Sequence, residues 1–290
     1  MTNYNSKYDY YLTYFNNQLK LALESIKSPS TLKEAMEYAV IGGGKRIRPV
    51  LCLATADMLG VELDRVSRYA VAIELIHSYS LVHDDLPAMD NDDYRRGQLS
   101  THKKFGEAIG ILAGDALLNY AFEFCLENPN FDKRDANALK VLANFAGCSG
   151  MIAGQVLDLQ NERNDLANEN TLYNIYHNKT AKLLTAPLLI ASVMANNKYY
   201  DQLENFGYHL GAMFQIVDDI MDVEGTVETI GKTPNKEADV DKLTAIKLFG
   251  IDGAKNKVLH HYTQCKNILD EINASEFIVE LTEKMHTRNK

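Results

Sequence analysis

Acidic side chains gather at two places in the sequence, each at the end of a long apolar segment. The first cluster lies within HSYSLVHDDLPAMDNDDYRRG and has five aspartates in ten residues: Asp84, Asp85, Asp90, Asp92 and Asp93. The second lies within FQIVDDIMD and has three: Asp218, Asp219 and Asp222. Carboxylates in this number suit Mg²⁺, which binds a few of them together with water and substrate phosphate oxygens.

Asp218 and Asp222 are four residues apart and therefore share one face of a helix. Gln215 and Gly211 continue that face, whereas the side chains that flank it are apolar. Two carboxylates ~6 Å apart repel by ~3 kcal/mol at an effective dielectric near 20, so a pair that lines a cleft needs a cation. One acidic cluster alone is usually a solvated face, but two clusters that each end an apolar helix favour metal binding.

Basic residues supply a second candidate chemistry, the binding of phosphate. GGGKRIRP (42–49) is not a Walker A motif, because Ala39 stands at the first glycine position and Lys45 is followed by Arg46. Glycines, cations and a proline that opens the next helix can still bind an anion at a helix start. A plain loop with solvated cations is the alternative. Further candidate phosphate ligands are Arg95, Arg96, Lys179, Lys232 and Lys242.

Composition narrows the possible partners and compartment. The 290-residue chain has a net charge of −9, which argues against a nucleic-acid partner because such a partner requires a basic face. We expect no signal peptide and no stable membrane association, because no stretch approaches 18 continuous apolar residues. The four cysteines form no CxxC pair and are expected to be thiols in a reducing compartment, the cytoplasm.

The hydrophobic pattern is helical throughout. Apolar residues recur three and four apart over 32–40, 56–85 and 111–128. Pro29, Pro87 and Pro129 stand where helices should stop or bend, and no linker divides the chain. We therefore predict an all-α fold of roughly ten helices, arranged as a single domain over residues 1–290.

Taken in order, the motifs resemble those of the trans-isoprenyl diphosphate synthases, and within that family those of the bacterial farnesyl diphosphate synthases. They are GGGKRIRP, HSYSLVHDDLPAMDNDDYRRG, LAGDALL, GQxxD (Gly154, Gln155, Asp158), the Lys179–Thr180 pair and FQIVDDIMD. The resemblance spans residues 42 to about 250 and implies a helical bundle around a central cavity, usually in a homodimer.

The resemblance also implies a role for each motif. Three Mg²⁺ ions would be held around an allylic diphosphate by the two aspartate motifs, chiefly by Asp84, Asp90, Asp218 and Asp222, with Asp85 and Asp219 as further candidate metal ligands. The same diphosphate would be bound by Arg95, Lys179, Lys232 and Lys242. Isopentenyl diphosphate would be bound by Lys45, Arg48, His77 and Arg96. Thr180 and Gln215 would lie beside the developing carbocation.

The implied reaction explains the charge pattern. Breaking an allylic C–O bond releases diphosphate and leaves a carbocation, which the double bond of isopentenyl diphosphate attacks before a proton is lost. Lewis-acid metal ions and cationic side chains stabilise the charge of the leaving group, and apolar helices exclude the water that would quench the cation. No side chain is an obvious base for the proton; in this family the released diphosphate accepts it.

Product length should depend on a wall one or two turns before the first aspartate motif. Ser80 is one turn from Asp84 on the same face, and Tyr79 is bulky and about 7.5 Å lower. Tyr79 is rotated by about 140° from Asp84 and could reach the channel only from the side. An aromatic residue here favours, by resemblance, a C15 product; an ordinary core tyrosine whose hydroxyl is hydrogen-bonded is the alternative.

One segment departs from the family pattern. After the second aspartate motif, Asn235 replaces the usual glycine and Glu237 the usual aspartate, and Asp239 is a possible substitute. The alternatives left open are a C10 or C20 synthase, a non-catalytic regulatory subunit, for which degenerate aspartate motifs would be expected, and a helical protein whose acidic clusters are merely solvated.

Overall fold

The computed structural model describes residues 3–162, 164, 166–224 and 242–288. Helices of the first half of the chain are α1 (Asn3–Ser25), α2 (Ser30–Ile41), α3 (Ile47–Leu59), α4 (Leu63–Asp84), α5 (Thr101–Phe105) and α6 (Glu107–Leu126). Those of the second half are α7 (Lys133–Ala146), α8 (Met151–Gln160), α9 (Glu169–Ile175), the π-helix η1 (Tyr176–Ala181), α10 (Lys182–Met194), α11 (Tyr200–Glu224), α14 (Ala245–Glu271) and α15 (Glu276–His286).

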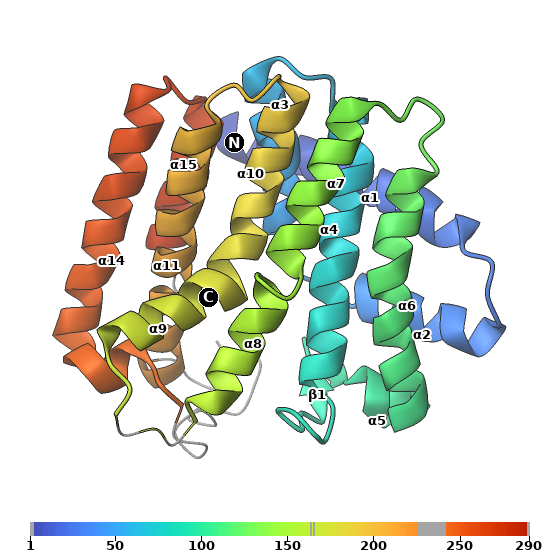
Figure 1. Ribbon diagram of the computed structural model, residues 1–290, viewed down its shortest axis with the longest axis horizontal. Coiled ribbons are helices and arrows are strands. Elements are labelled where there is room, and N and C mark those ends of the chain that lie inside the picture. Colours follow the sequence, from blue (N-terminus) through green and yellow to red (C-terminus); the bar gives the residue numbers. More distant parts are fainter. Residues whose placement is uncertain (1–2, 163, 165, 225–241, 289–290) are drawn as a thin grey trace.

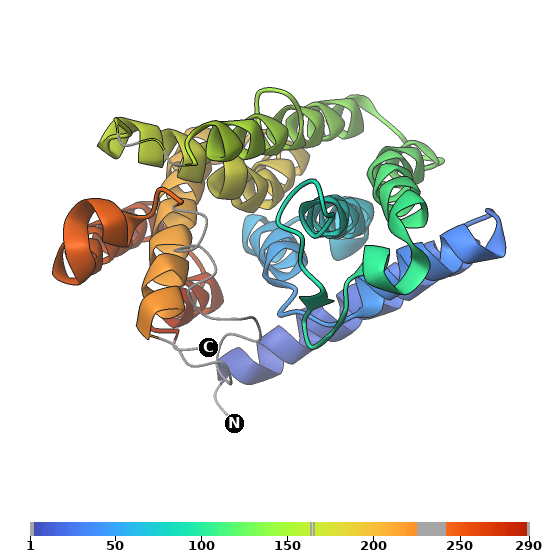
Figure 2. The ribbon, with the colours of Figure 1, turned by 90° about the horizontal axis from the view of Figure 1, so that it is seen from below.

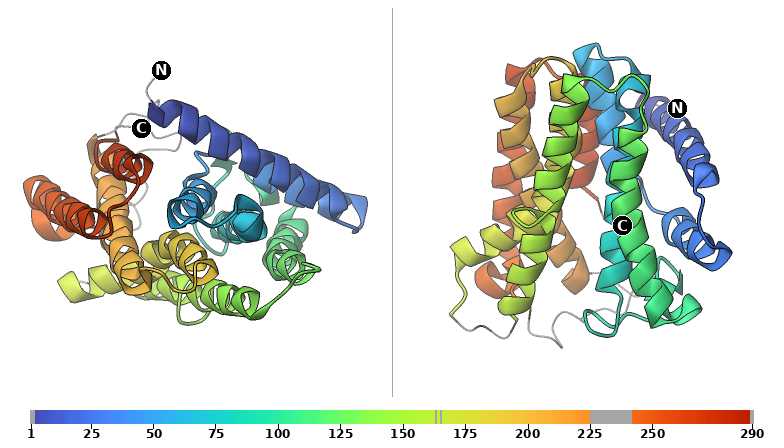
Figure 3. Two further views of the ribbon diagram at one scale, coloured as in Figure 1. Left: turned by 90° about the horizontal axis from the view of Figure 1, so that it is seen from above. Right: turned by 45° about the vertical axis from the view of Figure 1, so that its right-hand side comes forward.

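The long helices run roughly side by side, with α3 and α4 enclosed by the others (Figures 1 and 3). α4 packs against α3 and α6, whereas α10 packs against α3, α4, α7 and α11. α1 lies across one side of the bundle (Figure 2). The apolar run from Leu183 to Met194 makes α10 buried on every side, and the buried apolar side chains of the molecule form one continuous cluster. The predicted all-α fold class is confirmed.

The helical periodicity over 56–85 belongs to two helices, because the chain turns at Gly60. α3 ends at Leu59, and Gly60 adopts a left-handed conformation with φ +76°. Its N–H donates to the carbonyls of the last turn of α3, which satisfies groups that a helix end leaves free. Glycine adopts this backbone conformation at little cost, and α4 then begins at Leu63.

Within the described residues, the only strands are β1 (Tyr94–Arg95) and β2 (Gln98–Leu99), which form one antiparallel hairpin. Its turn consists of Arg96 and Gly97, which have φ values of +53° and +78°. Two positive φ values in a two-residue loop match the twist of a tight hairpin. The hairpin follows the first aspartate motif and gives Arg95 and Arg96 fixed directions.

α6 is unusually apolar for a helix at the surface. By length and composition alone it could cross a membrane, although core helices of soluble proteins pass the same test. Only 39% of its most apolar 18-residue window is buried within the molecule. Ile111, Leu112 and Leu126 are exposed, so a large part of the apolar surface of α6 is left open.

Candidate active site

The first aspartate motif begins at the last residue of α4 and folds back on itself. The backbone N–H of Asp90 donates to the carbonyl of Asp84 at 2.8 Å, and that of Asp92 donates to the carbonyl of Asp85 at 3.1 Å. Asn91 makes this turn possible with a left-handed φ of +49°. Asp84 and Asp90 are six residues apart in the sequence, yet the turn brings their backbones into contact.

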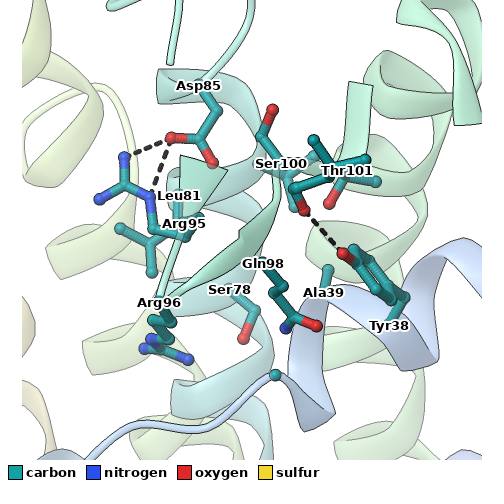
Figure 4. Close-up of a pocket in the computed structure, with 13 residues that line it drawn as sticks. Tyr38, Ala39, Ser78, Leu81, Asp85, Arg95, Arg96, Gln98, Ser100 and Thr101 are labelled. Carbon is teal, nitrogen blue, oxygen red and sulfur yellow. Dashed lines mark hydrogen bonds and ion pairs between the residues drawn. The ribbon is translucent and has the colours of Figure 1, made fainter. Parts of the chain in front are cut away.

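Asp85 is buried and holds the hairpin (Figure 4). Its Oδ1 accepts a hydrogen bond at 2.9 Å from Nε of Arg95, and Nη2 of the same guanidinium donates to that oxygen as well. Arg95 also lies 3.5 Å from a carboxylate oxygen of Asp92. In the structure Asp85 therefore fixes the position of Arg95, and its assignment as a metal ligand stays a prediction.

Arg96 points from the hairpin turn towards the glycine loop, where its guanidinium donates to the carbonyl of Gly43. A Cβ on Gly44 would lie 2.9 Å from Cζ of Arg96, and Gly44 has a φ of +118°. Gly44 thus leaves space for the guanidinium and adopts a backbone conformation that other residues avoid. The GGG segment brings the hairpin and the start of α3 together.

One pocket joins the glycine loop to the second aspartate motif. Among the residues that line it are Lys45, Arg48, His77, Arg96, Asp218 and Asp222. The basic members come from the loop, α3, α4 and the hairpin, and the two carboxylates come from the last turns of α11. All four residues predicted to bind isopentenyl diphosphate therefore lie in one pocket.

The pocket is rich in positive charge, and this charge affects its titratable groups. Burial lowers the pKa of Arg48 to about 10, although Glu74 acts in the opposite direction. The pKa of His77 is well below its ordinary value because of burial and the charges of Arg48 and Arg96. His77 is therefore neutral near pH 7, and its imidazole can donate one hydrogen bond without carrying charge.

Lys179 lies in η1, and its ammonium donates to Asp158 on α8 at 2.6 Å. Burial acts to lower the pKa of Lys179, but the charges of Asp158 and Asp84 outweigh burial and raise it. A Cβ on Gly154 would lie 2.1 Å from the backbone N of Lys179, so glycine permits α8 and η1 to approach closely. The GQxxD motif therefore positions Lys179 through its glycine and its aspartate.

η1 also connects to α11 through a chain of hydrogen bonds. The Thr180 hydroxyl donates to Oε1 of Gln215 at 2.8 Å, and Nε2 of Gln215 lies 3.3 Å from Asp219. A π-helix commonly marks a functional site, and here it directs Thr180 towards Gln215, one turn before Asp218. The two residues predicted to lie beside the carbocation are hydrogen-bonded to each other.

Asp219, like Asp85, is buried and holds neighbouring elements in place. Its carboxylate accepts a hydrogen bond at 2.7 Å from the N–H of Ala245, the first residue of α14, and another from the Tyr176 hydroxyl. A carboxylate at a helix N-terminus satisfies free N–H groups and is favoured by the helix dipole. The structure therefore shows Asp219, also a predicted metal ligand, fixing the start of α14.

Asp84 and Asp90 face cations from distant parts of the chain. Burial raises the pKa of Asp84, and Asp90 raises it further, whereas Lys179 and Lys242 act to lower it. Lys242, which precedes α14, forms an ion pair with Asp90 at 3.2 Å. Residues predicted to bind the allylic diphosphate thus surround the first aspartate motif. Lys232, Asn235, Glu237 and Asp239 lie outside the described residues.

Two residues that contact the site, Arg288 and Tyr8, come from parts of the chain where the sequence showed no motif. Arg288, beyond the end of α15, lines the pocket and donates to Asp218 at 2.5 Å and to the carbonyl of Phe214 at 2.8 Å. The Tyr8 hydroxyl on α1 donates to the carbonyl of Lys45. An isolated arginine and a tyrosine in a helix give no pattern that predicts these contacts.

Tyr79 is buried, and its hydroxyl has no hydrogen-bond partner in the described part of the chain. Burial, together with the charge of Asp84, raises its pKa to about 12. Its ring packs edge-on against His83 with a centroid separation of 5.8 Å. The alternative of a core tyrosine with a satisfied hydroxyl is therefore not what the structure shows. The Ser80 hydroxyl instead donates to the His77 carbonyl of its own helix.

The donors at the site fit magnesium that is shared with a ligand. Among the described residues, no three histidine, cysteine or carboxylate side chains converge closely enough to hold a metal ion alone. Mg²⁺ commonly binds one or two carboxylates and completes its coordination with water and substrate phosphates. The carboxylates of Asp218 and Asp222 on α11, which share a pocket with basic side chains predicted to bind phosphate, match this mode of binding.

Comparison with known proteins agrees with this site. Residues 29–280 match the family described as polyprenyl synthetase. The chain is 43% identical to a farnesyl diphosphate synthase of Haemophilus influenzae over 282 residues, which is 95% of this chain and 95% of that relative. The chain belongs to the polyprenyl synthetase family and is a prenyl-transferring enzyme.

Solved structures give the same result. The fold matches that of a geranyltransferase from Legionella pneumophila with a TM-score of 0.87 and 33% identity, over 98% of this chain and 97% of that one. It also matches a geranyltransferase from Helicobacter pylori, solved in complex with magnesium and isoprenyl diphosphate, with a TM-score of 0.81 and 32% identity over 95% of each chain.

Proposed function

We propose that the enzyme condenses dimethylallyl and geranyl diphosphates head-to-tail with isopentenyl diphosphate in the cytoplasm, and that its main product is C15 farnesyl diphosphate. The observation that carries the proposal is the pocket in which Asp218 and Asp222 face Lys45, Arg48 and other basic side chains. Such a site can bind a diphosphate by direct ion pairs and can share a divalent cation with a second diphosphate.

The two substrates use different sets of residues. Isopentenyl diphosphate takes the pocket of Lys45, Arg48, His77 and Arg96, where neutral His77 donates a hydrogen bond and the cations bind charge. The allylic diphosphate takes the region between Asp84 and the cations Lys179, Arg95 and Lys242, with Lys232 as a further proposed ligand. Two diphosphates side by side bring the reacting carbons together, which lowers the entropic part of the barrier.

Magnesium is held by Asp84, Asp90, Asp218 and Asp222, and we propose three ions per site. When bound, it supplies Lewis-acid stabilisation of the departing diphosphate. Asp85 and Asp219 act instead through the elements that they hold, Arg95 and the start of α14. Lys179 exchanges its ion pair with Asp158 for one with the diphosphate. The diphosphate carries more negative charge than the single carboxylate of Asp158, so it attracts the ammonium group more strongly.

The remaining side chains control the carbocation. The Thr180 hydroxyl and the Gln215 carbonyl oxygen are directed by their mutual hydrogen bond, and their dipoles stabilise positive charge that develops beside them. The buried apolar faces of α4, α10 and α11 exclude water that would trap the cation as an alcohol. The proton that leaves after condensation is taken by the released diphosphate.

A direct test supplies purified enzyme with isopentenyl diphosphate and with dimethylallyl, geranyl or farnesyl diphosphate, in the presence and absence of Mg²⁺. The release of diphosphate and the chain length of the product are measured. We expect Mg²⁺-dependent release and mainly C15 product. A main product of C10 or C20 would retain the reaction and reject the product assignment. If the purified protein is well folded but releases no diphosphate, the catalytic proposal is rejected and the alternative of a regulatory subunit remains.

We also propose that the enzyme is a homodimer assembled through α6. Ile111, Leu112 and Leu126 are 46–59% exposed on this helix, and half-buried Leu118 and Phe122 add to the apolar surface. A second copy can cover this surface with the same helix, because a two-fold interface pairs identical patches. Burial of the apolar area of α6 would supply the driving force.

Sedimentation of the Leu112→Glu variant tests the assembly. We expect the wild-type enzyme to sediment as a dimer and the variant as a monomer, since the substitution places a charge in the apolar interface. Leu21→Glu is the matched control, because Leu21 is 60% exposed on α1, a different surface. A wild-type monomer, or a variant that remains dimeric, would reject α6 as the interface.

A further inference from the structure

A buried ion pair, Arg46 and Glu74, forms part of the wall of the proposed isopentenyl diphosphate pocket. Nη1 of Arg46 lies 2.5 Å from Oε1 of Glu74, and the two side chains are only 7% and 2% exposed. Nη2 of Arg46 donates at 2.5 Å to the carbonyl of Val40, near the end of α2. Arg46 therefore ties three elements together: the end of α2, the loop before α3 and the middle of α4.

The backbone at Arg46 explains why this arginine points into the protein. Arg46 precedes α3 with a left-handed φ of +51° and ψ of +36°, which is uncommon for a residue other than glycine. This conformation directs the Arg46 side chain into the protein. Lys45 before it and Arg48 after it line the pocket, and the Lys45 side chain remains exposed. Within this one basic segment, Arg46 forms a buried ion pair, whereas Lys45 and Arg48 are proposed to bind the diphosphate.

Glu74 has more than one cationic neighbour. It is the largest favourable charge acting on Arg48 and also on Arg96, both of which are otherwise destabilised as cations by burial. The charge of Arg96 acts to lower the pKa of Arg48, and the charge of Arg46 acts to lower that of Arg96, so the cations of the pocket repel one another. Among the residues that line the pocket, Glu74 is the carboxylate on the side of the basic cluster, since Asp218 and Asp222 belong to α11.

We propose that Glu74 and Arg46 are positioning residues for isopentenyl diphosphate: the pair fixes the loop that carries Lys45 and Arg48, and the Glu74 carboxylate, which lines the same pocket, offsets the mutual repulsion of the Arg48 and Arg96 guanidinium groups before the diphosphate enters. This inference rests on the proposed function of the pocket. Preorganised cations do not need to be gathered against their mutual repulsion when the substrate binds, which is why preorganisation increases affinity. Neither residue is required to contact the substrate.

The test compares Glu74→Gln, Glu74→Asp and Arg46→Met with the wild-type enzyme. Calorimetric titration with isopentenyl diphosphate measures the dissociation constant, and steady-state kinetics measures KM for isopentenyl and geranyl diphosphates separately. For Glu74→Gln we expect isopentenyl diphosphate binding to weaken on the order of tenfold to a hundredfold, the scale of loss that misplaced binding groups cause. KM for geranyl diphosphate should change by less than about threefold, a difference too small to indicate a lost interaction. Glu74→Asp should recover part of the binding.

A matched control separates positioning from stability. Arg65 and Asp135 form another pair between α4 and α7, with N···O 3.1 Å and a fully buried Asp135, but neither residue lines the pocket. Asp135→Asn should lower the melting temperature and leave both KM values unchanged. Equal changes of both KM values in Glu74→Gln, or a change in melting temperature alone, would overturn the inference. Tighter binding would also overturn it, since Glu74 would then only oppose the substrate charge. A wild-type enzyme that does not bind isopentenyl diphosphate would instead reject the proposed function.

Discussion

Nη2 of Arg288 lies 2.5 Å from Oδ1 of Asp218, which joins the segment after the last helix to the second aspartate motif. The guanidinium also stacks on the Phe214 ring, with Cζ 3.7 Å from the ring centroid. Together with the hydrogen bond to the Phe214 carbonyl, these contacts with α11 hold Arg288 in the pocket beside Lys45, whose pKa is lowered by burial and by the Arg288 charge. The final residues of the described chain are part of the candidate site.

Arg288→Met should weaken the binding of isopentenyl diphosphate. The change removes one of the cations that line the pocket, and a hydrogen bond to a charged group contributes about 1.5–3 kcal/mol. We expect KM for isopentenyl diphosphate to rise by about tenfold, which corresponds to ~1.4 kcal/mol, with little change in KM for the allylic substrate. Arg134→Met, which removes an exposed arginine paired with Asp132, is the control. An unchanged KM would show that Arg288 only packs against α11.

Substitution of the proposed metal ligands should abolish most of the activity. We expect Asp84→Asn and Asp218→Asn each to lower kcat by at least about 10²–10³, the loss that follows removal of one group that stabilises developing charge. Measurement of rate against magnesium concentration should show a higher requirement. Asp93→Asn is the matched control, because Asp93 belongs to the same motif but is exposed and paired with Lys103 at 2.8 Å. Equal losses in the control and in Asp84→Asn would contradict the assignment.

Tyr79→Ala should lengthen the product, because it removes a buried ring beside the first aspartate motif. The variant will also lose stability, by about 3–5 kcal/mol if the cavity does not collapse. Tyr79→Phe separates the two effects: its product should remain C15, and its stability should not fall, since the hydroxyl has no partner in the described part of the chain. Chain-length analysis checks both variants. A C15 product from Tyr79→Ala would remove this residue as the wall.

Stability should decrease as the pH falls from about 6.5 to about 4, through two histidines between α11 and α14. Nδ1 of His209 lies 2.8 Å from Nδ1 of His261. Burial and the charge of His260 lower the pKa of His209 to about 4, and burial with the charges of His209, His260 and Lys257 lowers that of His261 to about 3. Nε2 of His261 also lies 3.1 Å from the hydroxyl of Tyr173 on α9. In this range the unfolded chain takes up protons that the folded chain does not.

Denaturant unfolding at several pH values between 7 and 4 checks this prediction. His261→Asn should show a smaller loss of unfolding free energy than the wild type over the same interval, because one group with a depressed pKa has been removed. If the wild type and the variant lose the same free energy, other groups cause the acid sensitivity and the histidine pair does not.

Periodicity predicted the fold class because amphipathic helices bury a repeating face, and this fold consists of such helices. It did not show the break at Gly60, where apolar residues continue through a turn and only the left-handed glycine marks the helix end. Residue spacing correctly put Asp218 and Asp222 on one face, but it did not predict that Asp219 turns to the start of α14. That contact depends on an element 26 residues later, and no local pattern encodes it.

Contacts between distant elements also limited the prediction of the candidate site from the sequence. Motif order grouped the residues that we propose to bind phosphate, whereas the sequence analysis missed the residues that support them. Glu74 did leave a signal, because it is a single charge within the apolar run AVAIELI of α4, and a buried charge needs a partner. Arg288 and Tyr8 left none, since their contacts arise only when α15 and α1 pack against the ends of other helices.

The glycines on either side of η1 have a consequence for redesign. A methyl group at Gly154 would lie 2.1 Å from the backbone of Lys179, and one at Gly211 would lie 2.2 Å from Cβ of Ala181. The wide turn of η1 therefore occupies space that its two neighbouring helices leave vacant. Anyone who grafts the lysine–threonine pair onto another helical scaffold must transplant three segments together, because the pair alone would be pushed out of register by ordinary side chains.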